Sequence, residues 1–266
     1  MNLTFVKKVC RKAIIASGKY LSEKHRREML HEGNIEARAQ RVLEMSSRIM
    51  VDQIDAQIPI KEVESNHRLT RLTIPGGELL LVPLDGKESY VFGQTNYSIG
   101  IAYQHSGVTQ VAGVFNPQYK ELFFGESDKP LKRNNQFAQV NDVRALEDSF
   151  LGYSYRGDYK AQGQKHLNTL FRLMRQPIRA MIPGSDLFGL TLVANGNLSG
   201  MILAAPSYDS LLPGLFIVER AGGRVTDVYG DPVSPTSELI LASNKHIHTE
   251  LIENVRQSMI LAHQEQ

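Results

Sequence analysis

LLLVPLDGKESYVFG, residues 79–93, is the stretch that decides the fold of this 266-residue chain. Its first residues are large and apolar, a run typical of a buried strand. Pro83-Leu84-Asp85-Gly86 then predicts a tight turn, because proline presets the backbone for a turn and glycine accepts a positive φ angle. The residues after Gly86 predict a short helix. We therefore expect a strand, a turn that carries a carboxylate, and a helix in direct succession.

This turn resembles a known metal-binding signature. It is similar to the Asp-Pro-(Ile/Leu)-Asp-Gly-Thr motif of the inositol monophosphatase family, which comprises Mg-dependent, lithium-sensitive sugar phosphatases. In this chain Val82 stands in place of the first Asp, and Lys87 stands in place of the Thr. Mg²⁺ prefers hard oxygen ligands, and valine supplies none. The ammonium group of Lys87 would also repel a dication. The chain is thus identified as a divergent member with degenerate metal-binding motifs.

Further family motifs follow in the expected order. The stretch from Tyr208 to Gly214 resembles the family's Trp-Asp-x-Ala-Ala-Gly, and Asp209 keeps its carboxylate. ERAGGRVTDVYGDP, residues 219–232, resembles a structural stretch in which Gly222-Gly223 ends a helix and Gly230-Asp231-Pro232 forms a hairpin turn. Gly184-Ser185-Asp186 matches the family's Gly-(Ser/Thr)-Ala, which lines the substrate pocket. Val193-Ala194-Asn195-Gly196 matches the family's Val-Ala-x-Gly. The resemblance extends from the first helix to about Asn244.

The resemblance implies a possible set of metal ligands. If a single Mg²⁺ is retained, its ligands are expected to be Glu64, the Leu84 carbonyl, Asp85 and Asp209. Alignment on the Glu-Ser pair of the family's Ile-Gly-Glu-Glu-Ser places Val63 at the ligand position. A slip of one residue would allow Glu62 or Glu64 to serve instead. Without the metal, these acidic residues of segment 61–68 are expected on a solvated loop.

Other positions depart from the family pattern. The family's Thr-x-x-Asp, which holds the catalytic water, should fall near Ala37 to Gln40, but Glu36-Ala37-Arg38-Ala39-Gln40 contains neither Thr nor Asp. Leu203 lies about where the family has an acidic residue that binds substrate hydroxyls. These departures remove groups that hold water or bind substrate in the family, whereas the motifs that shape the backbone are kept.

Two functions follow from this pattern. The favoured one is a pseudophosphatase, a protein that keeps the family fold as a binding or regulatory module. In it, Lys87 is expected to pair with Asp85 or Asp209 and replace the metal. The alternative is a divergent Mg-dependent phosphomonoesterase that hydrolyses inositol monophosphate or a related sugar or nucleotide phosphate, with the metal polarising the phosphate.

The expected ligands and partners follow from the same residues. A phosphorylated small molecule or an inorganic anion is expected to bind at Gly86, Lys87, Gly184 and Ser185. The resemblance also implies a homodimer. The first thirty residues are rich in Lys and Arg, which leaves a protein or RNA partner open but by default indicates the polar face of a helix.

Composition limits the class of protein. The chain has 42% hydrophobic and 22% charged residues and a formal net charge of +2, which is typical of a large globular protein. Its single cysteine, Cys10, forms no disulfide within the chain and fits a reducing cytoplasm. Lysine and arginine interrupt the first apolar stretch, so neither a signal peptide nor a membrane span is expected. His246 and His248 lack a nearby third metal ligand.

The family resemblance implies an α+β subdomain over residues 1–148, followed by an α/β subdomain over residues 149–266. The family resemblance implies an αβαβα layered sandwich. Residues 4–50 show the apolar spacing of two helices. The predicted strands of the first part are Arg71 to Ile74, Glu78 to Val82, Asn96 to Gln104, Val108 to Asn116 and Glu121 to Gly125, with a hairpin element from Lys129 to Val140. In the second part, strands and helices alternate from Ser149, including helices over Gly163 to Arg175, Asp186 to Ala194, Leu211 to Ala221 and His246 to Ala262.

Overall fold

The computed structural model describes residues 2–28, 34–66, 68–155, 168–170, 172–173 and 179–264. The chain forms two compact units. The first consists of Met1–Phe137, Gly184–Phe188 and Asp209–Ile217, and the second of the remaining residues. The units differ from the predicted halves in two ways: the first unit ends at Phe137 and not at residue 148, and it takes in two short segments of the second half. Both of these segments contribute residues to the candidate site.

Two long helices begin the first unit, as predicted. They are α1 (Leu3–Glu28) and α2 (Ile35–Asp55). The Asn34 side chain caps α2 by accepting a hydrogen bond of 3.1 Å from the Ala37 amide, which satisfies one of the free N–H groups of the first turn. The apolar side of each helix is buried, so each helix is held mainly by packing.

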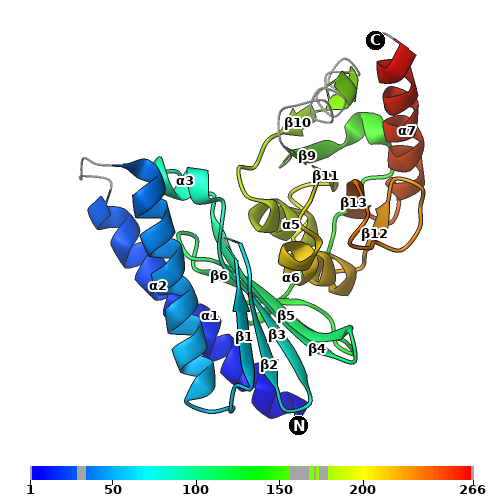
Figure 1. Ribbon diagram of the computed structural model, residues 1–266. Coiled ribbons are helices and arrows are strands. Elements are labelled where there is room, and N and C mark those ends of the chain that lie inside the picture. The colour runs from blue at the N-terminus through cyan, green and yellow to red at the C-terminus, as the bar shows by residue number, and fades with distance from the viewer. Residues whose placement is uncertain are drawn as a thin grey trace. The chain divides into compact units, whose positions relative to one another are not determined.

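The first sheet has eight strands in sequential, antiparallel order, and α1 and α2 cover one of its faces (Figure 1). Its strands are β1 (Glu62–Ser65), β2 (Thr70–Ile74), β3 (Gly77–Asp85), β4 (Ser98–His105), β5 (Val108–Asn116), β6 (Glu121–Glu126), β7 (Lys132–Arg133) and β8 (Gln136–Phe137). The expectation of a loop around Glu62 and Glu64 is wrong, because these residues pair with β2 as an edge strand. Their side chains are exposed, as expected.

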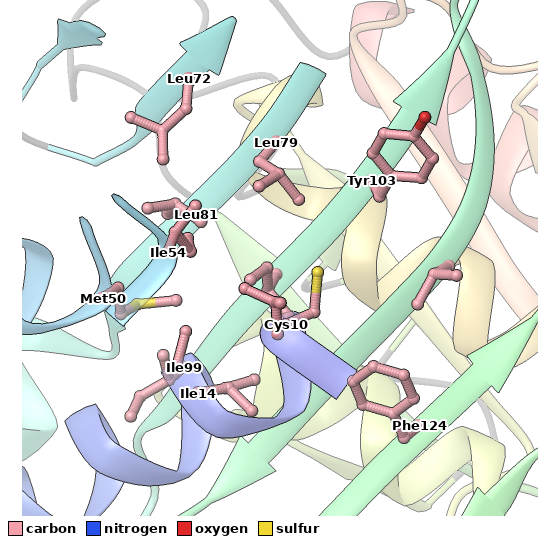
Figure 2. Packing of buried hydrophobic residues seen from close by; sticks show 14 of the residues in the cluster. Cys10, Ile14, Met50, Ile54, Leu72, Leu79, Leu81, Ile99, Tyr103 and Phe124 are labelled. Carbon is pink, nitrogen blue, oxygen red and sulfur yellow. The ribbon is translucent and has the colours of Figure 1, made fainter. Parts of the chain in front are cut away.

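The core of this unit lies between the helices and the sheet. Leu79 and Leu81 of β3 pack there with Cys10, Ile14 and Met50 from the helices (Figure 2). Because side chains alternate along a strand, Glu78, Leu80 and Val82 point to the other face of the sheet. Burial raises the pKa of Cys10 to about 12, so its thiol is a packing group.

The second unit contains a mixed sheet of order β10-β9-β11-β13-β12. These strands are β9 (Phe150–Tyr155), β10 (Arg179–Met181), β11 (Gly200–Ala204), β12 (Gly223–Asp227) and β13 (Leu239–Asn244). β9 is parallel to β10 and β11, and the other pairs are antiparallel. The helix predicted over Gly163 to Arg175 falls largely outside the described residues, although residues 168–170 and 172–173 are helical.

Among the residues that the structure describes after β10, three helices lie close to where the sequence predicts them. They are α5 (Asp186–Ala194), α6 (Tyr208–Arg220) and α7 (His248–Gln264). The beginning of α5 and most of α6 belong to the first unit. None of the helices in the described ranges has the length and apolar character needed to cross a membrane.

Candidate functional site

The signature turn has the backbone that its sequence predicts. β3 runs to Asp85 with a register shift after Val82, and Gly86 is followed directly by the short helix α3 (Lys87–Val91). Gly86 has a φ angle of +83°, and a Cβ atom there would lie 2.7 Å from the Cβ of Ser185 and 2.9 Å from the Asn96 carbonyl oxygen. Glycine is therefore required both by the backbone angle and by close packing.

Asp85 is a helix cap in this structure. Its carboxylate accepts hydrogen bonds from the Ser185 hydroxyl at 2.5 Å and from the Leu187 amide at 2.8 Å, and the residue is only 6% exposed. The Ser185 hydroxyl also accepts a hydrogen bond from the Phe188 amide at 3.1 Å. A carboxylate at the beginning of α5 is favoured by the positive end of the helix dipole. Its charge is thus stabilised without a metal ion.

Asp209 forms an ion pair with Arg71, a residue that the sequence reasoning missed. Arg71 Nη2 lies 2.8 Å from Asp209 Oδ2, and Arg71 Nη1 lies 2.5 Å from Glu78 Oε2. Glu64 is the cross-strand partner of Arg71 on β1. Burial lowers the pKa of Arg71, but the hydrogen bond to Glu78 and the charges of Asp209, Glu78 and Glu64 outweigh burial and raise it. A guanidinium group therefore serves as the counter-ion of this acidic group.

Strand alternation is the signal that could have found Arg71. Arg71 lies opposite Glu64 on β1 and diagonally opposite Glu78 on β3, so these three side chains share one face of the sheet. Its contact with Asp209 could not be inferred in this way, because Asp209 is 138 residues away in sequence.

Lys87 pairs with Glu36 and with neither of the expected partners. Lys87 Nζ lies 2.7 Å from Glu36 Oε1, so the prediction of an Asp85 or Asp209 partner is wrong. The reason is that Asp85 is already satisfied by α5 and Asp209 by Arg71. Glu36 lies at the beginning of α2, beside the segment that lacks the family's water-holding Thr and Asp. Lys87, which departs from the family pattern, thus bonds to the residue that precedes this segment.

Val82, at the position of the family's first aspartate, is in an apolar environment. It is 2% exposed. A Cβ atom placed on Gly100 of the neighbouring strand would lie 2.8 Å from Leu187 Cδ1, 3.1 Å from Pro213 Cγ and 3.2 Å from Val82 Cβ. Carbon atoms of Leu187 and Pro213 therefore lie close to Val82, and the valine side chain supplies no oxygen ligand.

The residues present do not fit the Mg²⁺ site that the family implies. Of the predicted ligands, Asp85 is bonded to α5, Asp209 is bonded to Arg71, and Glu64 is on the exposed edge strand. The side chain of Leu84 packs in the core, and its main-chain carbonyl stays a predicted ligand. Among the described residues, no group of three His, Cys, Asp or Glu side chains could hold a metal ion.

The predicted anion-binding residues are partly brought together. Gly86 is packed against Ser185 and the Gly184 carbonyl, and the Ser89 hydroxyl donates to that carbonyl at 3.4 Å. The Ser185 hydroxyl is occupied by Asp85, and the Lys87 ammonium by Glu36. Anion binding at these residues stays a prediction.

The remaining residues of interest have structural roles. Leu203 is buried in β11. His248 is buried, with Nδ1 2.7 Å from the Ser243 hydroxyl and Nε2 2.9 Å from the Thr226 hydroxyl. Burial, and to a smaller extent the charge of Arg224, lower the pKa of His248 to about 4. The imidazole is therefore neutral and joins two hydroxyl groups.

Comparison with known proteins defines the class. The model of the inositol monophosphatase family matches residues 2–259, so the chain belongs to this family. The predicted family and fold class are thereby confirmed.

Particular relatives and a solved structure agree with this assignment. A fructose-1,6-bisphosphatase/inositol-1-monophosphatase of Thermotoga maritima is 25% identical over 213 residues, which cover 80% of each chain. A putative Nus factor SuhB of Neisseria meningitidis serogroup B is 25% identical over 176 residues, or 66% of this chain and 67% of the relative. The crystal structure of SuhB from Bartonella henselae has a TM-score of 0.82 at 21% identity and covers 95% of this chain and 98% of that one.

Proposed function

We propose that this protein is a pseudophosphatase, an inositol-monophosphatase fold that acts as a binding or regulatory module. The observation that carries the proposal is the ion pair between Arg71 and Asp209, at a position where the family resemblance expects a metal ligand. A metal ion would have to displace a guanidinium group that also bonds Glu78. The metal ion would also lack the carboxylate ligand of the family's first Asp, because residue 82 is valine.

The other bonds of the site support the same proposal. Asp85 is committed to two donors at the beginning of α5, and these bonds would weaken if the carboxylate turned toward a metal. Lys87, which stands in place of the family's Thr, is bonded to Glu36.

Membership of the family is compatible with either function. The names of the relatives include an enzyme, inositol-1-monophosphatase, and a factor, Nus factor SuhB. The second name is compatible with a regulatory role for this chain, with a protein or RNA partner. The homodimer and the cytoplasmic location stay predictions.

A phosphate-release assay tests the proposal. Purified protein is incubated with inositol 1-phosphate, a sugar bisphosphate or a nucleotide 3′-phosphate in the presence of Mg²⁺ or Mn²⁺. The matched control is the Asp85→Asn/Asp209→Asn double variant, which has the same shape without the two carboxylates. We expect the wild type to release no more phosphate than the variant. Mg-dependent release that the double variant loses would instead establish a divergent phosphomonoesterase.

A further inference from the structure

Helix α1 presents unpaired positive charges at its surface. Between Leu3 and Ser22 the helix contains five Lys or Arg residues and no Asp or Glu. Lys8, Arg11 and Lys12 are exposed, and they form no ion pair within the part of the chain that the structure describes. The opposite side of the helix is buried in the core. These three cations are therefore available to a partner.

A second group of cations lies beside the beginning of α1. The Glu126 carboxylate at the end of β6 is bonded by Lys7 of α1 and, at 2.8 Å, by Lys129. The first turns of α1 thus lie next to the end of β6. Arg11 is one helical turn after Lys7 and lies on the same side of the helix. The charge of Glu126 is matched by two lysines, so it does not neutralise Arg11.

An exposed aromatic ring lies on the same face of the sheet. Phe124 of β6 packs in the core with Cys10 of α1 (Figure 2). Lys132 is the cross-strand partner of Phe124, and Phe137 is the partner of Lys132. Directly opposed residues point to the same face, so Lys132 and Phe137 lie on the face that α1 covers. Phe137 is 74% exposed, and Lys132 Nζ is 5.5 Å from the centre of its ring.

We propose that this surface binds single-stranded nucleic acid. We call it the α1–β8 surface, and it consists of Lys8, Arg11, Lys12, Lys132 and Phe137. Its cations attract phosphates of the backbone, and its exposed ring offers a platform on which one base can stack. This combination is typical of proteins that bind single strands without reading their sequence.

Other anionic partners fit the α1–β8 surface less well. An acidic peptide would use the cations but has no flat base for the Phe137 ring. A membrane would require a broad apolar helix face at the surface. Phe5 and Ile15 of α1 are 40% and 41% exposed, but the other large apolar side chains described for α1 are buried or half-buried. Asp128, an exposed carboxylate next to Lys129, reduces the local positive charge without cancelling it.

Fluorescence anisotropy with a labelled oligouridylate of about 16 nucleotides tests the proposal on the full chain. We expect binding at about 50 mM salt that weakens steeply toward about 200 mM, because phosphate contacts release counter-ions. Lys8→Glu/Arg11→Glu/Lys12→Glu should weaken binding at least about tenfold and reduce the salt slope by about 2. The matched control reverses three exposed cations of the second unit, Arg144→Glu/Arg179→Glu/Lys245→Glu.

A second pair of variants separates stacking from charge. Phe137→Ala should weaken binding by about tenfold, since stacking of one base contributes about 1–3 kcal/mol. Tyr229→Ala is its control, because Tyr229 is also an exposed ring beside a cation, Arg256. The proposal is overturned if the wild type does not bind the oligonucleotide. It is also overturned if the control triple loses as much affinity, or if polyglutamate competes as well as unlabelled RNA.

Discussion

The signature turn of the first unit and residues 219–232 of the second unit have diverged in different ways. In the second unit, the glycines do what the family motif predicts. α6 ends before Gly222, whose φ angle is +86°, and Gly230 has a φ angle of +89° in the following turn. The Asp227 carboxylate holds that turn by accepting hydrogen bonds from the amides of Tyr229 and Asp231.

In the first unit the motif keeps its backbone conformation, but its polar side chains have other partners than a metal ion. Gly86 still has a positive φ angle, but Val82 is apolar and Asp85 caps a helix. Asp209 and Lys87 are paired with Arg71 and Glu36. This difference shows that the fold depends on residues that shape the chain, and that carboxylates expected to bind metal can bond to other groups of the chain instead. Family membership alone therefore does not establish catalysis.

Restoring the family's first aspartate is expected to have the largest effect on stability. Val82→Asp places a carboxylate among carbon atoms of Leu187 and Pro213 and should lower the free energy of unfolding by about 4 kcal/mol. Val82→Ala is the control for lost packing and should cost clearly less. Equilibrium urea unfolding with and without Mg²⁺ measures both. If Mg²⁺ returns Val82→Asp to wild-type stability, a metal site can be assembled and the comparison fails.

Removing the Asp85 carboxylate should have the next largest effect. Asp85→Ala leaves two donors at the beginning of α5 unpaired in a buried place, so we expect a loss of about 3 kcal/mol. Asp227→Ala also removes an acceptor of two amides, but at the exposed turn of the second unit, and should cost about 1 kcal/mol. Equal losses in urea unfolding would show that burial does not distinguish the two carboxylates.

Adjacent glycines of the second unit should respond to different constraints. A Cβ atom on Gly223 would lie 2.6 Å from Val218 Cγ1 and 2.8 Å from the Ser243 carbonyl oxygen, so Gly223→Ala should cost about 2 kcal/mol. Gly222 has open space around it but a φ angle of +86°, so Gly222→Ala should cost about 1 kcal/mol. Thermal unfolding can rank the two. The reverse order would mean that the backbone angle, not packing, controls this turn.

The smallest expected effect is a pH dependence in the second unit. The pKa of His248 is lowered from 6.5 to about 4 in the folded chain. As the pH falls from about 6.5 toward 4, His248 takes up a proton in the unfolded chain but not in the folded chain. Protonation therefore stabilises the unfolded chain, and the free energy of unfolding falls. The expected loss is about 1–2 kcal/mol. His248→Gln should flatten the stability curve in this range, and an unchanged slope would exclude His248 as its cause.

The sequence predicted backbone features better than side-chain partners. The strand–turn–helix at Gly86 and the helix end at Gly222 depend on local chemistry, and both could be predicted. The strand at Glu62 was missed because all of its side chains are exposed, so it lacks apolar alternation. The partners of Lys87 and Asp209 depend on segments 51 and 138 residues away, whose approach only the folded chain reveals.

Calorimetric titration of chelator-treated protein with Mg²⁺, and then with Mn²⁺, tests the central claim most directly. The claim is that the carboxylates at the family's metal-ligand positions are bonded to other groups of the chain and not to a metal ion. We predict no stoichiometric heat of metal binding in the wild type, because Asp85 and Asp209 are bonded to α5 and Arg71. Stoichiometric binding that Asp209→Asn abolishes would contradict the claim and indicate a working metal site.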